Sequence, residues 1–184
     1  MSLEHAILGF LNYGALSGYD LKKAFDASVR HFWPVDQSQI YRSLARLAEQ
    51  DLAEVKVIEQ QVRPDRKVYH ITAAGRAELR RWLATPLPPP EPRSAPLIQV
   101  FFAGQLSDEE ILTVLERAAI ETRQVLAQYA QIPQNAQSYA QRVGSPREVF
   151  FWMLTLEYGT QTMQAQLEWI ESAIQRIKNK QYPG

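Results

Sequence analysis

The spacing of apolar residues predicts two short helices at the start of the chain. In residues 3–12 the apolar positions recur at helical intervals, at Leu3, Ile7, Phe10 and Leu11. Ser17 and Asp20 have the spacing of a capping box, in which each side chain hydrogen-bonds to the other residue's backbone amide. A second helix is therefore expected to begin at Ser17 and to continue through Phe25, with Pro34 interrupting the pattern beyond it.

A third helix is predicted to follow Asp36. Gln39 lies three residues further on, which again is the spacing of a capping box. The inner face of this helix consists of Ile40, Leu44 and Leu47, at positions i, i+4 and i+7. The outward face then offers polar side chains, namely Gln37, Ser38, Gln39, Tyr41, Arg42, Ser43 and Arg46.

Two strands and a fourth helix are expected next. Residues 55–58 and 68–71 are rich in β-branched and aromatic side chains, and a polar turn that contains Pro64 separates them. Thr72 is expected to begin a helix that runs through Trp82. Three helices followed by a two-stranded hairpin are typical of a winged helix-turn-helix, whose third helix enters the major groove of DNA.

The C-terminal half is predicted to be helical. One helix is expected to start at Ser107, and a second at Ser145-Pro146, where serine caps the helix and proline takes its first position. The second helix carries a sustained heptad stripe, Val149, Met153, Leu156, Thr160, Met163, Leu167, Ile170, Ile174 and Ile177. The first carries a similar stripe, Ile111, Leu115, Ala118, Thr122, Val125, Tyr129 and Ile132. A helix over residues 146–179 would be roughly 50 Å long. Because the chain cannot bury both stripes alone, the pattern predicts a homodimer formed by these helices.

A proline-rich segment separates the two patterns. Six of the 11 prolines lie in residues 86–96, which predicts a stiff linker. The expected fold class is therefore mostly α, with a winged helix-turn-helix domain in residues 1–85. A helical, coiled-coil-like domain for dimerisation and effector binding is expected in residues 97–184.

The chain as a whole has no net charge, with 20 basic and 20 acidic residues, but the charge is unevenly distributed. Residues 1–85 contain 12 basic and 10 acidic side chains, whereas the remainder contains 8 and 10. Residues 60–81 contain six basic and two acidic side chains. Neutrality of the whole chain therefore does not exclude nucleic acid as a partner, because binding depends on where the charge lies.

Several other function classes find no support. The chain has no cysteine, which rules out disulfides, thiolate metal sites and a cysteine nucleophile. The three histidines lack metal-ligand spacing, and no phosphate-binding loop or nucleophile motif is present. We therefore expect no cofactor, no metal and no enzymatic activity. No apolar run reaches about 18 residues and no basic leader is visible, so we expect a cytoplasmic protein without a membrane partner.

Candidate DNA contacts are indicated by side-chain chemistry. Glutamine and arginine match adenine and guanine edges, which suggests that Gln37, Gln39 and Arg42 read bases. Contacts to DNA are also expected from Ser38 and Tyr41, and a phosphate contact from Arg46. The basic residues around the hairpin turn are expected to contact the DNA backbone. These are Arg63, Arg66 and Lys67.

Three segments resemble PadR-type transcriptional regulators. Residues 3–11, followed by Ser17-Gly18-Tyr19-Asp20-Leu21, look like the opening of that family. Residues 40–47 resemble its recognition helix, and residues 66–76 resemble its wing strand and the helix after it. The resemblance implies a dimeric, ligand-responsive repressor of double-stranded DNA with an inverted-repeat operator. Family members that respond to phenolic acids and drugs suggest a small aromatic or hydrophobic effector.

Two questions stay open at this point. Trp152 and Phe101 are candidates for an effector pocket, although packing in the core or between subunits is the simpler interpretation of both. The alternative function is a winged-helix module that binds protein and has lost DNA binding. Basic and amide side chains on the outward face of the third helix favour DNA.

Overall fold

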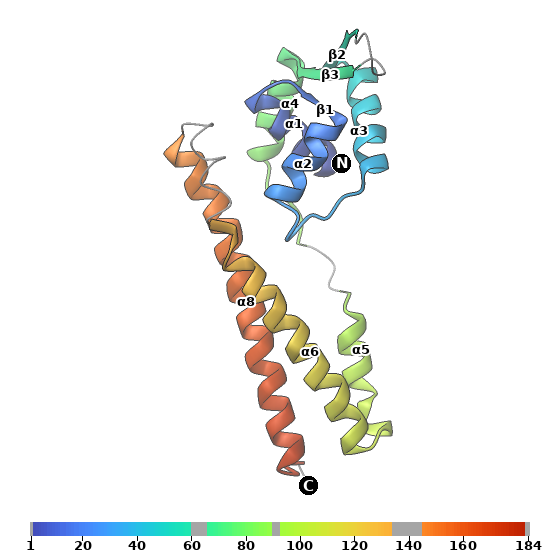
Figure 1. Ribbon diagram of the computed structural model, residues 1–184, viewed down its shortest axis with the longest axis vertical. Helices are drawn as coiled ribbons and strands as arrows, with labels where there is room; N and C mark the ends of the chain where they lie inside the picture. The colour runs from blue at the N-terminus through green and yellow to red at the C-terminus, as the bar shows by residue number, and fades with distance from the viewer. Residues whose placement is uncertain (1, 60–65, 90–92, 134–144, 183–184) are drawn as a thin grey trace. The chain divides into compact units, whose positions relative to one another are not determined.

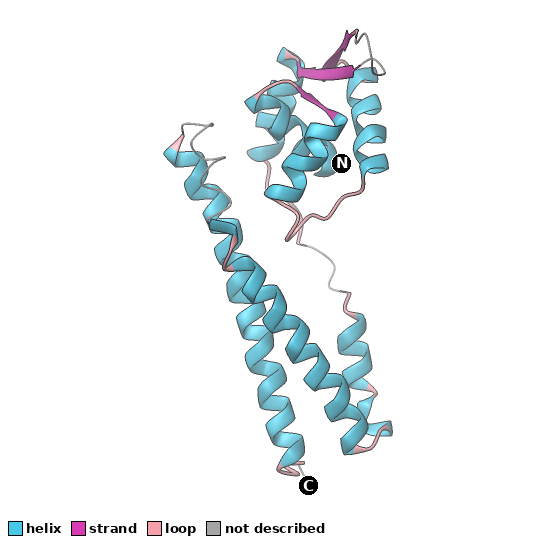
Figure 2. Ribbon diagram, viewed as in Figure 1, coloured by secondary structure: helices cyan, strands magenta, loops and turns pink. Residues whose placement is uncertain are grey.

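A computed structural model describes residues 2–59, 66–89, 93–133 and 145–182. The chain divides into two compact units, residues 1–88 and 89–184, and each is described by itself. The first unit contains helices and a small sheet, and the second is helical (Figures 1 and 2). No helix within the described ranges is both long and apolar enough to cross a membrane.

The first unit contains four helices and three strands among the described residues. The helices are α1 (Ser2–Tyr13), α2 (Gly18–Ala27), α3 (Gln37–Glu49) and α4 (Ala73–Leu83). The strands are β1 (Leu16–Ser17), β2 (Ala53–Ile58) and β3 (Arg66–Ile71). They form an antiparallel sheet in the order β1-β3-β2, with Tyr69 of β3 opposite both Leu16 and Val55. The predicted helices and hairpin strands are confirmed, whereas β1 was not predicted.

The core of the first unit is formed by the predicted apolar faces. Seven aliphatic and aromatic side chains from the three N-terminal helices are at most 1 % exposed: Ile7, Leu8, Leu21, Phe25, Ile40, Leu44 and Leu47. Three of them are the predicted inner face of α3. Burying such side chains contributes about 1.5–3 kcal/mol each. The orientation of α3 is therefore fixed by its inner face, which leaves the opposite face available to a partner.

A polar cluster joins α1 to α4. His5 is buried, its Nε2 lies 2.9 Å from Glu78 Oε1, and its ring stacks on Trp82 with centroids 4.7 Å apart. Arg81 donates two further hydrogen bonds to the Glu78 carboxylate, at 2.8 and 2.6 Å. Hydrogen bonds from Arg81 and His5 lower the pKa of Glu78 to about 2.

Glu78 should make the folded state sensitive to acid. Its pKa rises from about 2 to an ordinary value of 4.5 on unfolding, so its contribution is fully present above pH 4.5 and is lost as the pH falls through 2. Over that interval the free energy of unfolding of the wild type should fall more steeply than that of Glu78→Gln. Urea denaturation at several pH values between about 2 and 5 measures this difference. Parallel pH profiles would contradict the assignment.

The second unit is built on two long helices that run side by side. α6 (Asp108–Tyr129) contributes Ile111, Leu115 and Ala119 to a core shared with Ile170 and Ile174 of α8 (Pro146–Lys178). Ion pairs join the same helices, from Arg123 to Glu171 at 2.5 Å and from Lys178 to Glu116 at 2.7 Å. All nine positions of the predicted heptad stripe on α8 are buried or half-buried, as are all seven positions of the other predicted stripe. The expectation that the chain cannot cover these stripes alone was therefore wrong, because α6 and α8 pack against each other.

Two short helices that were not predicted precede α6. They are α5 (Ala95–Phe101) and the 3-10 helix η1 (Ala103–Gln105). Ser94 caps α5, and Pro96 lies in its first turn, where the missing amide hydrogen has no intrahelical partner to lose. The last residues of the predicted linker, 95 and 96, therefore belong to a helix. None of the residues of α5 is buried within the chain.

Candidate nucleic-acid interface

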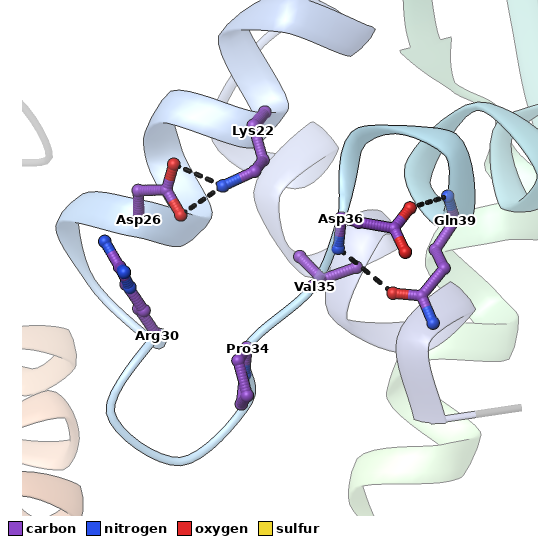
Figure 3. A pocket seen from close by; sticks show the side chains of 7 residues that line it. All are labelled: Lys22, Asp26, Arg30, Pro34, Val35, Asp36 and Gln39. Carbon is purple, nitrogen blue, oxygen red and sulfur yellow. Dashed lines mark hydrogen bonds and ion pairs between the residues drawn. The ribbon is translucent and has the colours of Figure 1, made fainter.

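The start of α3 is held by a reciprocal capping box. Asp36 Oδ1 accepts a hydrogen bond from the Gln39 backbone amide at 2.8 Å, and Gln39 Oε1 accepts one from the Asp36 backbone amide at 3.0 Å (Figure 3). Ser38 Oγ donates to Asp36 Oδ1 at 2.6 Å. Hydrogen bonds from Ser38 and the Gln39 amide hold the pKa of Asp36 below its usual value. Two predicted contact residues thus take part in the cap, Gln39 directly and Ser38 through Asp36, and both are exposed, as is Gln37 beside them.

The outward face of α3 is smaller than the sequence suggested. Tyr41 and Arg42 are exposed as expected. Ser43 was predicted on this face but is fully buried, so that prediction was wrong. It lies three residues after Ile40 and four before Leu47, which places it on the apolar side of the helix.

Tyr41 lies where α3 meets α2 and the sheet. Its ring covers Gly18, where an added Cβ would lie 2.4 Å from Tyr41 Cε1. Burial of the Tyr69 side chain on β3 raises its pKa, and the electrostatic effect of the nearby Tyr41 raises it further. Tyr41 is nevertheless 44 % exposed, so one edge of its ring is open to a partner.

Arg46 is tied to the first helix. Its Nε lies 2.9 Å from Glu4 Oε1, and its Nη2 lies 3.4 Å from Ser43 Oγ. The Arg46 side chain remains 59 % exposed. A phosphate contact by Arg46 would therefore require exchange of a carboxylate for a phosphate.

The wing, which we define as β2 and β3, places Arg66 and Lys67 at the exposed start of β3. Arg63 lies outside the described residues. Arg66 Nη2 is 2.5 Å from Asp20 Oδ2 at the beginning of α2. Partial burial opposes ionisation of Asp20, but hydrogen bonds from Ser17 and Arg66 outweigh it and hold the pKa of Asp20 below its usual value. Asp20 was predicted only as a capping residue, and no spacing in the sequence indicated this contact.

The two candidate effector residues lie on separate helices of the second unit. Phe101 on α5 is 80 % exposed, and Trp152 on α8 is half-buried. A cavity of about 410 Å³ lies in the first unit, beside α2 and the start of α3 (Figure 3). Its lining residues are Lys22, Asp26, Arg30, Pro34, Val35, Asp36 and Gln39. Neither effector candidate lines this cavity.

Two family profiles match the chain. The profile described as the transcriptional regulator PadR-like family matches residues 7–81, which include all described elements that form the candidate interface. The profile described as virulence activator alpha C-term matches residues 92–178.

Two relatives are similar to this chain over about half of its length or more. "Probable transcriptional regulator Rv1176c" of Mycobacterium tuberculosis is 46 % identical over 92 residues, which are 50 % of this chain and 49 % of that protein. "Negative transcriptional regulator PadR" of Bacillus subtilis is 34 % identical over 109 residues, which are 59 % of this chain and 60 % of that protein. The chain thus matches about half to three-fifths of the length of these relatives.

Solved structures match over nearly the whole chain. The crystal structure of Bacillus subtilis PadR in complex with operator DNA has a TM-score of 0.84 at 27 % identity and covers 96 % of this chain and 99 % of that chain. The complex of the same protein with p-coumaric acid has a TM-score of 0.77 at 26 % identity, over 97 % and 99 % of the two chains. The predicted fold class is therefore confirmed, and both relatives are named as transcriptional regulators. Residues 7–81 thus match the PadR-like family of transcriptional regulators, and residues 92–178 match the virulence activator alpha C-terminal type.

Proposed function

We propose that this protein is a transcriptional regulator that binds operator DNA as a homodimer through α3. The observation that carries the proposal is the two-sided character of α3. Its apolar side is completely buried, and its other side presents Gln37, Tyr41 and Arg42 next to the wing. The related Bacillus subtilis PadR, which is solved in complex with operator DNA, supports this assignment.

In the proposed complex α3 enters the major groove. Arg42 can donate two hydrogen bonds to one guanine, and Gln37 can pair with one adenine. Arg66 and Lys67 lie at the wing, where a phosphate contact fixes position without reading sequence. The wing contact requires Arg66 to exchange Asp20 for a phosphate oxygen.

The proposed dimer is formed by the helices of the second unit. α5 exposes Leu97, Ile98 and Phe101 by 57, 62 and 80 %, respectively. Phe150 and Phe151 on α8 are 58 and 47 % exposed. A partner subunit that covers these side chains would remove large apolar groups from water, and exposed apolar patches commonly mark protein–protein interaction sites. The two copies of α3 would then reach major-groove segments about 34 Å apart.

We further propose that the protein is a repressor released by a small aromatic effector. The relative solved with p-coumaric acid supports this ligand class, and its name describes a negative regulator. Trp152 and Phe101 are the aromatic side chains proposed to contact the effector. Such a ligand releases DNA only if it binds the DNA-free arrangement of the dimer more tightly than the DNA-bound arrangement.

Selection of bound fragments from random duplex DNA tests the proposal. The expected result is an inverted repeat whose half-site centres are about one helical turn apart. Recovery of no preferred sequence, together with no salt-dependent affinity for duplex DNA, would favour the protein-binding alternative. A selected sequence placed at a promoter then separates repression from activation in a transcription assay.

Gly18→Ala should weaken DNA binding more than it weakens folding. The new methyl group would displace the Tyr41 ring, which is 44 % exposed and can turn toward solvent, so the overpacking cost should stay at about 1 kcal/mol. We expect lower affinity for the selected duplex and a free energy of unfolding that falls by about that amount. Gly9→Ala is the matched control, because no atom lies within 4 Å of a Cβ added there. Equal DNA affinity of the two variants would contradict the role of Tyr41.

A further inference from the structure

The exposed side of α2 carries a tyrosine and a lysine that contact each other. Lys23 Nζ lies 4.5 Å from the centroid of the Tyr19 ring. Tyr19 is 55 % exposed, and Lys23 is also exposed. Lys23 follows Tyr19 by about one helical turn, and a cation–π interaction with the ring holds the ammonium group in place. The Tyr19 hydroxyl and the Lys23 ammonium remain open to a partner.

The charge of Lys23 is available, whereas neighbouring charges are paired. Lys22 forms an ion pair with Asp26 on the same helix, and Arg66 forms one with Asp20. Among the residues that the structure describes, no carboxylate lies within ion-pair distance of Lys23. The exposed end of α2 therefore presents an uncompensated cation beside a hydroxyl donor.

This pair is continuous with the proposed DNA interface on two sides. Gly18, directly before Tyr19, lies against the ring of Tyr41 on α3. Asp20, directly after it, binds Arg66 of the wing. The first turn of α2 thus lies between the recognition helix and the wing and contacts both.

We propose that Tyr19 and Lys23 bind one phosphate of the DNA backbone, between the major groove that α3 enters and the backbone beneath the wing. The Tyr19 hydroxyl donates to a phosphate oxygen, and the Lys23 ammonium supplies the positive charge. Contacts of this chemistry fix the register of a protein on DNA and carry no sequence information. This inference rests on the proposed function and adds a contact that fixes the position of α3.

Lys23→Ala and Tyr19→Phe test the site in the full-length protein. Two duplexes of about 30 base pairs serve as probes, one with the selected inverted repeat and one with the same bases in scrambled order. Both variants should bind both duplexes more weakly, and each variant should lose the same factor on the two. For Lys23→Ala the slope of log affinity against log salt should become shallower by about 0.9 for each subunit. Because both side chains are exposed, the thermal unfolding midpoint should stay at the wild-type value.

Lys180→Ala is the charge-matched control, since it removes an exposed lysine of the second unit. A Lys23→Ala variant with the affinity and salt slope of this control would overturn the proposal. A loss confined to the selected duplex would also overturn it, because it would indicate base reading. A Tyr19→Phe variant that binds with wild-type affinity would show that the Tyr19 hydroxyl makes no contact with DNA. Failure of the wild type to bind either duplex would instead contradict the proposed function itself.

Discussion

A double variant with Ile98→Asp and Phe101→Asp is expected to be monomeric and to bind the operator about 100-fold more weakly, or worse. Both side chains lie on α5 and are 62 and 80 % exposed, so aspartate costs little within the isolated chain. In the proposed dimer the same positions would be desolvated, and a buried unpaired carboxylate strongly opposes association. Loss of the partner subunit converts two linked contacts with DNA into one.

Sedimentation equilibrium and a binding titration on the selected duplex measure the two effects. Gln124→Asp, which adds one charge to the exposed polar surface of α6, is the control and should behave like the wild type. A double variant that remains dimeric would show that α5 lies outside the interface. A monomer with wild-type affinity would contradict the view that affinity arises from two copies acting together.

Arg42→Ala is expected to weaken binding to the selected duplex by about 1–3 kcal/mol, or roughly 5- to 150-fold. The guanidinium is exposed on the outward side of α3, where it can reach two acceptors on one guanine. The discrimination between selected and scrambled duplex should narrow by a similar factor, because base contacts carry specificity.

The control for Arg42→Ala is Arg80→Ala, which removes an exposed arginine of α4 outside the candidate interface. Fluorescence anisotropy with both duplexes at moderate salt compares the two variants. If Arg42→Ala kept the full preference for the selected sequence, α3 would not be the element that reads DNA.

Local signals in the sequence predicted most of the fold. Capping boxes at Ser17, Asp36 and Ser107 each place a helix start at the position observed, because the two hydrogen bonds of a box involve residues only three apart. The heptad stripe likewise identified the buried side of α8, since side-chain direction in a long helix is determined by spacing.

Features that depend on distant residues were missed. β1 has only two residues, too few for an alternating pattern, and it exists because Leu16 pairs with Tyr69 more than 50 positions away. The ion pairs of Arg46 with Glu4 and of Arg66 with Asp20 similarly join separate elements. The burial of Ser43 could have been predicted from its spacing relative to Ile40 and Leu47, but its polar side chain favoured a position on the outward face.

These ion pairs change how the candidate site is understood. The sequence suggested Arg46 and Arg66 as free cations facing phosphate, whereas each is already bound to a carboxylate of its own unit. In the proposed complex, DNA must therefore compete with Glu4 for Arg46 and with Asp20 for Arg66. Arg42 and Lys23, which are exposed, are better placed to provide the first contacts.

If this protein binds specific DNA through α3, a salt titration of the wild type should show it. Affinities for the selected and the scrambled duplex are measured over a range of salt concentrations. We expect about 1,000-fold or greater preference for the selected duplex. We also expect the logarithm of each affinity to fall linearly with the logarithm of salt concentration. Equal affinity for both duplexes, or binding that does not respond to salt, would contradict specific DNA binding through α3.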